Sequence, residues 1–201
     1  MPKIVNKEEK RKRIAQSSIE LLLEKGIRNL TVSEVAQKAN IGKGTIYQYF
    51  QSKEDIVFEI ISAYTSEVIL ELNDSLQKAA TCREKVLIFF DFFMNDSQKN
   101  KDALKVYQEY LGINFSSKNE AMSCYNTQCS QQFEIIFEQI IQEGIEKKEL
   151  NSNAIKFVPI FLLSERGMIL SHATQLDFNL KEQMLHMIHT LFDVLEKKNV
   201  G

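Results

Sequence analysis

Apolar residues recur every three or four positions along most of the chain, which is the spacing of an amphipathic α-helix. Polar turn and capping residues interrupt this pattern at intervals. The pattern predicts nine helices, over residues 7–25, 32–39, 43–50, 53–78, 83–96, 101–114, 118–148, 153–175 and 180–198. Pro159 lies inside the eighth of these, where it predicts a kink or a later start. With only 2 prolines and 7 glycines in 201 residues, the chain is expected to be all-α.

The segment 31–53 predicts two short helices joined by a tight turn. Thr31 and Glu34 have the spacing of a capping box, which places the start of one helix directly after Thr31. Asn40 tolerates the left-handed backbone conformation that ends a helix, and Gly42 can cap the next one. Helix, short turn and helix is the arrangement that places its second helix in the major groove of DNA.

The outer face of that second helix carries side chains suited to DNA. Ile46 and Phe50 lie four positions apart and face inward, which leaves polar side chains on the opposite face. Lysines offer cations to phosphates, hydroxyl groups offer neutral donors, and Gln48 can pair with a base edge. The predicted DNA contacts are Thr31, Lys43, Gly44, Thr45, Tyr47, Gln48, Tyr49 and Lys53. The alternative is that the tyrosines are half-buried packing residues and the lysines a solvated face.

The whole segment resembles the TetR family of transcriptional regulators. The family pattern T-V-x-x-I-A-x-x-A-G-V-S-K-G-T-L-Y-x-Y-F-x-S-K-E-x-L is matched by TVSEVAQKANIGKGTIYQYFQSKEDI, beginning at Thr31. Asn40 stands for the usual Gly and Gly42 for the usual Ser, and losing that hydroxyl is expected to remove one phosphate contact. The resemblance covers about the first quarter of the chain. It implies a DNA-binding domain there, a C-terminal half whose middle helices surround an effector cavity, and pairing of two chains.

Charge is distributed unevenly along the chain. The net charge is −2, but residues 1–53 carry eleven Lys and Arg against five Glu, a net charge of +6, which leaves −8 for residues 54–201. This asymmetry predicts two domains, a DNA-binding domain over 1–53 and a helical ligand-binding and dimerisation domain over 54–201. Much of the positive excess lies in Lys7, Lys10, Arg11, Lys12 and Arg13. Such clusters usually only solubilise a protein, but beside a helix-turn-helix these residues are expected to touch phosphates.

The composition excludes several other classes of protein. No apolar run approaches the roughly 18 residues of a membrane helix, and the polar N-terminus does not have the pattern of a signal peptide. A cytoplasmic location without a membrane partner is therefore expected. The 3 cysteines lack metal-finger spacing and are interpreted as reduced thiols. His186 and His189 lack a further ligand at matching spacing, so neither a metal nor a cofactor is predicted.

The C-terminal part is rich in large apolar side chains, which predicts a helical core and, given the resemblance, an effector cavity. Glu165 and Arg166 interrupt the apolar run FVPIFLLSERGMIL, so they are expected to orient a guest or to lie at a subunit interface. Glu109 and His172 are further polar candidates. The predicted effector contacts are Phe89, Phe93, Tyr107, Tyr110, Tyr125, Gln128, Gln132, Phe161 and Glu165. For most of the aromatic residues, an ordinary place in the core is the competing interpretation.

The last two predicted helices contain more apolar residues than one small bundle can bury, which predicts a homodimer through a four-helix interface. The residues that carry this expectation are Ala154, Phe157, Phe161, Leu162, Met168, Ile169, Met184, Leu185, Ile188, Leu191, Phe192 and Leu195. The leading hypothesis is a dimeric repressor that a small apolar or amphipathic molecule releases from operator DNA. The alternatives are an all-α enzyme and a helical adaptor, each with a DNA-targeting module. Whether the effector releases or strengthens DNA binding stays open.

Overall fold

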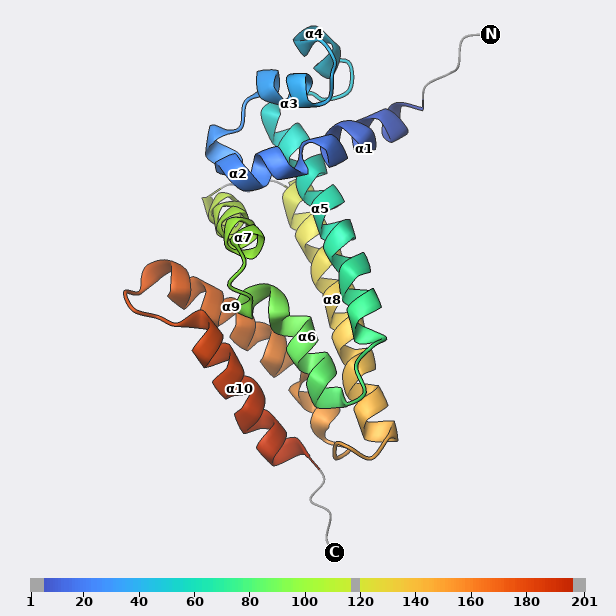
Figure 1. Ribbon diagram of the computed structural model, residues 1–201, viewed down its shortest axis with the longest axis vertical. Coiled ribbons are helices and arrows are strands. Elements are labelled where there is room, and N and C mark those ends of the chain that lie inside the picture. Colours follow the sequence, from blue (N-terminus) through green and yellow to red (C-terminus); the bar gives the residue numbers. More distant parts are fainter. Residues whose placement is uncertain (1–5, 117–119, 197–201) are drawn as a thin grey trace, which may run out of the picture. The chain divides into compact units, whose positions relative to one another are not determined.

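The computed structural model describes residues 6–116 and 120–196, and within these ranges the regular structure is helical (Figure 1). The one β feature described is an isolated bridge between Leu150 and Glu196. The helices are α1 Lys7–Ser17, α2 Ile19–Asn29, α3 Val32–Lys38, α4 Lys43–Ile46, α5 Lys53–Leu76, α6 Cys82–Met94, α7 Gln98–Ser116, α8 Glu120–Glu146, η1 Ala154–Phe157, α9 Val158–Thr174 and α10 Leu180–Leu195. The all-α prediction is confirmed.

The first predicted helix is two helices, because the chain bends at Ser18. The hydroxyl groups of Ser17 and Ser18 both donate to the carbonyl of Ile14, at 2.8 and 2.9 Å. Serine side chains that bond back to the preceding turn compete with the helix ladder and bend it. The prediction of one helix over 7–25 was therefore wrong. Gly26 interrupts the helical backbone of α2, with φ of 76°.

The later helices lie within a few residues of their predicted bounds. Pro159 falls in the first turn of α9, directly after η1, so it marks a later start and not a kink. The predicted start at Lys118 and the predicted end at Lys198 lie outside the described residues.

The chain forms two compact units, and their bounds differ from the predicted domains. The first unit contains residues 1–71 and 101–113, and the second contains 72–100 and 114–201. Helix α5 begins at Lys53, the last residue of the first predicted domain, and belongs to the first unit as far as Glu71. Buried apolar side chains of α1 to α5 and of the turns between them form the core of the first unit, among them Ile14, Leu22, Leu30, Val35, Ile46, Phe50, Ile56 and Ile60.

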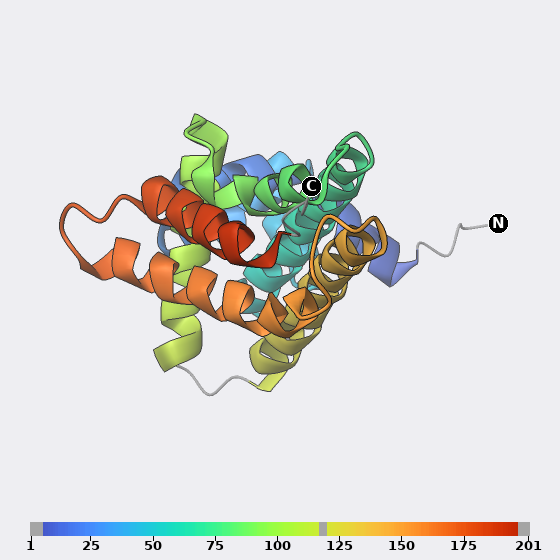
Figure 2. The ribbon, with the colours of Figure 1, turned by 90° about the horizontal axis from the view of Figure 1, so that it is seen from below.

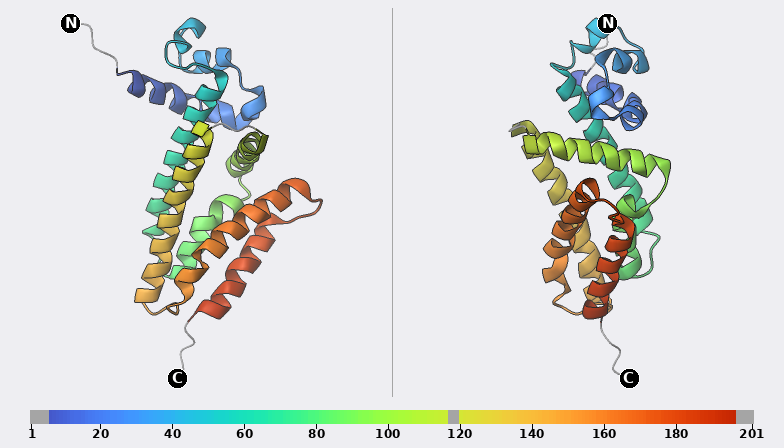
Figure 3. Two further views of the ribbon diagram at one scale, coloured as in Figure 1. Left: turned by 180° about the vertical axis from the view of Figure 1, so that it is seen from behind. Right: turned by 90° about the vertical axis from the view of Figure 1, so that its left-hand side faces the viewer.

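The second unit is a bundle of α6, α8, α9 and α10. Helix α6 packs against α8 and α10, and α9 packs against α8 and α10. Figure 2 shows α9 and α10 running alongside each other, and Figure 3 shows the same pair from two further directions. Phe90, Phe137, Phe161 and Phe192 are almost completely buried in this bundle.

Candidate nucleic-acid interface

The capping box predicted at the start of α3 is present. The Thr31 hydroxyl accepts from the amide of Glu34 at 3.3 Å, and the Glu34 carboxylate accepts from the amide of Thr31 at 3.1 Å. Lys25 of α2 also pairs with this carboxylate. Hydrogen bonds from Lys25 and Thr31 lower the pKa of Glu34, so the cap is ionised at neutral pH. The Thr31 hydroxyl is engaged in the cap, and its predicted contact with DNA stays a prediction.

The turn after α3 has the geometry of a Schellman motif. The amide of Ile41 donates to the carbonyl of Ala36 at 3.0 Å, and the amide of Asn40 donates to the carbonyl of Gln37 at 3.1 Å. Asn40 has φ of 54°, which confirms the left-handed conformation expected from the sequence. This turn fixes the direction in which α4 leaves α3.

The recognition segment, residues 43–50, contains the short helix α4 and has one buried and one exposed face, as predicted. Ile46 and Phe50 are 0% and 1% exposed, whereas Lys43, Gly44 and Gln48 are exposed. The Tyr47 side chain is 54% exposed, so its phenol is available to a partner. A Cβ added at Gly44 would meet nothing within 4 Å. The backbone at Gly44 is therefore open to close approach by a duplex.

The recognition segment contains less regular helix than predicted, because α4 ends at Ile46. The amides of Gln48 and Tyr49 donate to the carbonyls of Thr45 and Ile46, at 3.1 and 2.9 Å, which are i to i−3 bonds of the 3₁₀ type. Residues 43–50 still describe a continuous helical turn, but the prediction of an α-helix through Phe50 was wrong.

Arg11 of α1 ties the recognition segment to α5. Its guanidinium pairs with Asp55 at 2.7 Å and with Glu59 at 2.8 Å. It also donates to the carbonyl of Tyr49 at 2.6 Å and lies over the ring of Phe50, 4.5 Å from the centroid. These interactions orient the guanidinium toward the protein. The expectation that Arg11 touches phosphates stays a prediction, and these contacts compete with it. No local pattern in the sequence linked Arg11 to carboxylates on a distant helix.

The other residues predicted to contact phosphates differ in whether their side chains are already paired within the protein. Arg13 pairs with Glu9 at 2.5 Å, whereas Lys7 and Lys12 are exposed. Lys53, the first residue of α5, donates to the main-chain carbonyl of Arg28 at 2.9 Å. An ammonium group has three donors, so Lys53 can keep this bond and still reach a phosphate.

The predicted effector residues are divided between the two units. Tyr107 and Tyr110 of α7 belong to the first unit, and the other seven belong to the second. In the second unit Phe89 packs against Phe137 at 4.8 Å between ring centroids, and Phe137 packs against Phe161 at 5.2 Å. Phe89 and Phe161 are thus members of an aromatic core.

The polar effector candidates differ in burial. Gln128 and Gln132 lie on an exposed face of α8. Glu165 is only 7% exposed, and its Oε1 atom has no hydrogen-bond partner among the described residues. Burial raises the pKa of Glu165 to about 7, against the opposing charge of Arg166. Arg166 itself donates to the hydroxyl of Ser130 at 2.7 Å. Glu165 is therefore the polar candidate that the fold leaves unsatisfied in an apolar setting.

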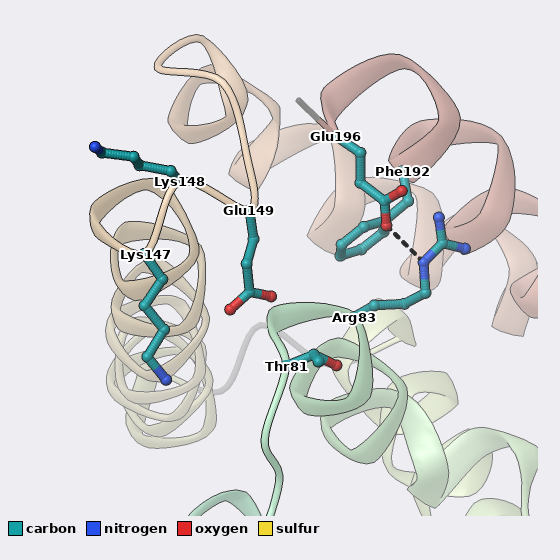
Figure 4. A pocket seen from close by; sticks show the side chains of 7 residues that line it. All are labelled: Thr81, Arg83, Lys147, Lys148, Glu149, Phe192 and Glu196. Atoms are coloured by element: carbon teal, nitrogen blue, oxygen red, sulfur yellow. Dashed lines mark hydrogen bonds and ion pairs between the residues drawn. The ribbon is translucent and has the colours of Figure 1, made fainter. Parts of the chain in front are cut away.

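A cleft of about 400 Å³ lies elsewhere in the second unit, where α6 begins and α8 and α10 end (Figure 4). It is lined by Thr81, Arg83, Lys147, Lys148, Glu149, Phe192 and Glu196. Arg83 pairs with Glu196 at 2.8 Å and lies over the ring of Phe192, 4.8 Å from its centroid. None of the predicted effector residues lines this cleft.

The fold and the exposed face of residues 43–50 place the protein in the class of all-α proteins with a helix-turn-helix. A helix-turn-helix of this kind, here in the first unit, reads double-stranded DNA. The family model "Bacterial regulatory proteins, tetR family" matches residues 14–60. The Fatty acid metabolism regulator protein of Bacillus subtilis (strain 168) is 31% identical over 75 residues, which cover 37% of this chain and 39% of that protein. Residues 14–60 thus match the DNA-binding region of the tetR family of bacterial regulatory proteins.

The likeness to curated relatives is concentrated in one part of their length. The uncharacterized HTH-type transcriptional regulator YvkB of the same strain is 38% identical over 55 residues, which cover 27% of this chain and 29% of that protein. These two alignments span less than half of either relative.

Solved structures share the fold over nearly the whole chain. A putative transcriptional regulator from Saccharomonospora viridis in complex with choline superimposes with a TM-score of 0.76 at 15% identity, covering 95% of this chain and all of that one. FadR from Bacillus subtilis in complex with stearoyl-CoA has a TM-score of 0.61 at 20% identity, covering 90% and 96%. At these identities the likeness establishes the fold alone. No helix in the described ranges is long and apolar enough to cross a membrane.

Proposed function

We propose that this protein is a homodimeric transcriptional repressor that binds operator DNA through α3 and α4 and is released by a small effector. The observation that carries the proposal is the two-faced recognition segment, in which buried Ile46 and Phe50 support exposed Lys43, Tyr47 and Gln48. The proposal includes a cytoplasmic location, where such DNA lies, and no enzymatic activity.

The proposed dimer forms through an apolar stripe on the outward face of α9. Ile160, Leu163 and Leu170 are 48%, 65% and 55% exposed at helical spacing. Gly167 lies in the same stripe, and a Cβ added there would meet nothing within 4 Å, so a partner helix can approach closely. Two copies of α4 can enter successive major grooves only if their centres lie about 34–36 Å apart.

The apolar residues that carried the dimer expectation are mostly used within the chain. Phe161, Ile169, Met184, Ile188 and Phe192 are at most 1% exposed in a single copy. They pack inside the bundle and cannot be the surface that meets a partner. The proposed interface therefore relies on the outward residues of α9 instead.

The proposed effector is an amphipathic molecule with a cationic or hydrogen-bond-donating group that meets Glu165. Glu165 shares the buried face of α9 with Phe161 and Ile169, so a donor placed there would meet apolar neighbours and one unsatisfied carboxyl oxygen. The fold relatives support this class, since one was solved with choline and another with stearoyl-CoA.

The proposed binding to operator DNA is tested by footprinting the purified chain on the DNA flanking its own gene. We expect salt-dependent protection of a palindrome, and no protection by a variant carrying Tyr47→Ala and Gln48→Ala. A chain that binds every duplex equally, or none, would contradict the proposal.

The effector is tested separately by mass spectrometry of small molecules that co-purify with the chain. By linkage, a releasing effector must bind the free dimer more tightly than the operator complex, by the same factor by which it weakens DNA binding. Equal affinity for both forms would refute release, and tighter binding to the complex would identify a corepressor.

A further inference from the structure

A carboxylate from α7 holds the bend in α2, and both belong to the first unit. Glu109 Oε2 accepts from the amide of Ile27 at 2.6 Å and from the amide of Arg28 at 3.4 Å. Two successive amides that point at one carboxylate form the anion-binding arrangement found at helix N-termini. Glu109 therefore caps the turn that follows Gly26.

Gly26 makes this approach possible in two ways. Its φ of 76° lies in the left-handed region, which L side chains rarely adopt. A Cβ at this position would also lie 2.8 Å from Glu109 Oε1, closer than real Cβ contacts. Glycine thus permits both the bend and the seating of the carboxylate against it.

Lys53 forms a hydrogen bond with the same capped turn. The amide of Arg28 faces Glu109, and the carbonyl of Arg28 accepts from Lys53 Nζ at 2.9 Å. The backbone of one residue is thus held from both sides, by a carboxylate of α7 and by the ammonium group at the start of α5. Fixing this carbonyl fixes where the Lys53 ammonium group rests.

We propose that Glu109 is a positioning residue for DNA binding, which holds Lys53 ready for a phosphate through the backbone of Ile27 and Arg28. The inference rests on the proposed function, since Lys53 is one of its predicted phosphate contacts. It assigns to Glu109 a role in the DNA-binding unit, in place of the effector contact considered from the sequence.

The chain contains a matched control for this contact. In the second unit Glu149 Oε2 accepts from the amide of Cys82, also at 2.6 Å, and caps the start of α6. Gly144 plays the corresponding part there, because a Cβ at that position would lie 2.6 Å from Cys82 Sγ. Glu149→Gln therefore removes the charge of an equivalent cap, while its amide oxygen can still accept, in a unit that carries no predicted DNA contact.

The first test needs no DNA. Full-length wild type, Glu109→Gln and Glu149→Gln are labelled briefly with acetic anhydride, and the rate at Lys53 is compared with the rate at exposed Lys78 by peptide mass spectrometry. We expect the ratio to rise at least about twofold in Glu109→Gln, because the Arg28 backbone whose carbonyl accepts from Lys53 is then held less firmly. The ratio should stay unchanged in Glu149→Gln. Equal ratios in all three proteins would overturn the proposal.

The second test measures affinity for a duplex that the wild-type chain selects from a random library, at a temperature where every variant is folded. Glu109→Gln should weaken binding about fivefold to tenfold and lower the salt slope by about one phosphate, whereas Glu149→Gln should change neither. In a Lys53→Met background Glu109→Gln should have no further effect. Additive losses, or equal losses in Glu109→Gln and Glu149→Gln, would overturn the proposal. If the wild type selects no duplex, the proposed function itself fails, and the labelling ratio still decides whether Glu109 positions Lys53.

Discussion

Arg11 and Tyr49 lie 38 residues apart in the chain, yet the guanidinium of Arg11 donates to the carbonyl of Tyr49 at 2.6 Å. The same guanidinium pairs with Asp55 and Glu59 of α5. One side chain thus holds the end of the recognition segment against the helix that follows it. The geometry of this segment therefore depends on a side chain of α1, outside the segment itself.

Replacing Arg11 by Met should lower the stability of the chain by about 1–3 kcal/mol, because partly buried carboxylates lose their partner. Arg13→Met is the control, since its exposed pair with Glu9 should contribute little. Urea unfolding monitored by circular dichroism measures both. Equal effects of the two substitutions would contradict the role given to Arg11.

The loss of stability caused by Arg11→Met should depend on pH. Burial raises the pKa of Asp55, but hydrogen bonds from Arg11 and from the Gln51 amide outweigh it, and the pKa is lowered below the ordinary 3.8. A lowered carboxyl pKa contributes stability above the unfolded value, which is lost as the pH falls through the folded value. The stability gap between wild type and Arg11→Met should therefore narrow below about pH 3.8. If the stability difference between wild type and Arg11→Met is constant from pH 7 to pH 3, the pairing of Arg11 with ionised Asp55 is not its cause.

Lys53 and Gln48 should affect DNA binding in different ways. Lys53→Ala should weaken binding to all sequences alike and reduce the salt slope by about one phosphate. Gln48→Ala should relax the preference at one or two base pairs, at a cost of about 1–3 kcal/mol on the selected sequence. Titrations on selected and random duplexes separate the two outcomes. If both variants lose affinity equally on both duplexes, Gln48 does not read a base.

Glu165 should make the ligand-free protein less stable as the pH rises. Its pKa is about 7 in the folded chain and about 4.5 when unfolded, so the unfolded chain gives up its proton first. Stability from this group is complete below about pH 4.5 and is lost as the pH rises to about 7, by about 3 kcal/mol. In Glu165→Gln this decline should be absent, as measured by urea midpoints at pH 5 and pH 8. Parallel pH profiles for the two proteins would show that the carboxyl group has another partner in solution.

The proposed interface predicts that Leu163→Glu yields a monomer. A charge in the outward stripe of α9 would have to be buried without a partner on dimerisation, which costs several kcal/mol. Leu70→Glu is the control, because Leu70 of α5 is 68% exposed and Leu163 is 65% exposed. Analytical ultracentrifugation at micromolar concentration should find a dimer for the wild type and for Leu70→Glu. A monomeric wild type would refute the interface altogether.

Features that depend on a few neighbouring residues were determined by the sequence alone. The Thr31 and Glu34 cap, the left-handed Asn40 and the inward pair Ile46 and Phe50 each involve residues at most four positions apart, so backbone geometry settles them. The all-α class follows in the same way, because helical periodicity repeats along the chain. The bend at Ser18 is also local, but the apolar pattern did not predict it. The hydroxyl groups of Ser17 and Ser18 donate to the carbonyl of Ile14, and this leaves the spacing of apolar residues unchanged.

Only the tertiary structure decided which polar groups meet across distant helices. Arg11 reaches Asp55 across 44 residues, and Glu109 reaches Ile27 across 82, although neither pair has any spacing that a local pattern could reveal. The same holds for Glu165, whose unsatisfied oxygen depends on how α9 packs against its neighbours. Such contacts are set by the packing of helix against helix, which fixes side-chain positions only after the cores of the units have formed.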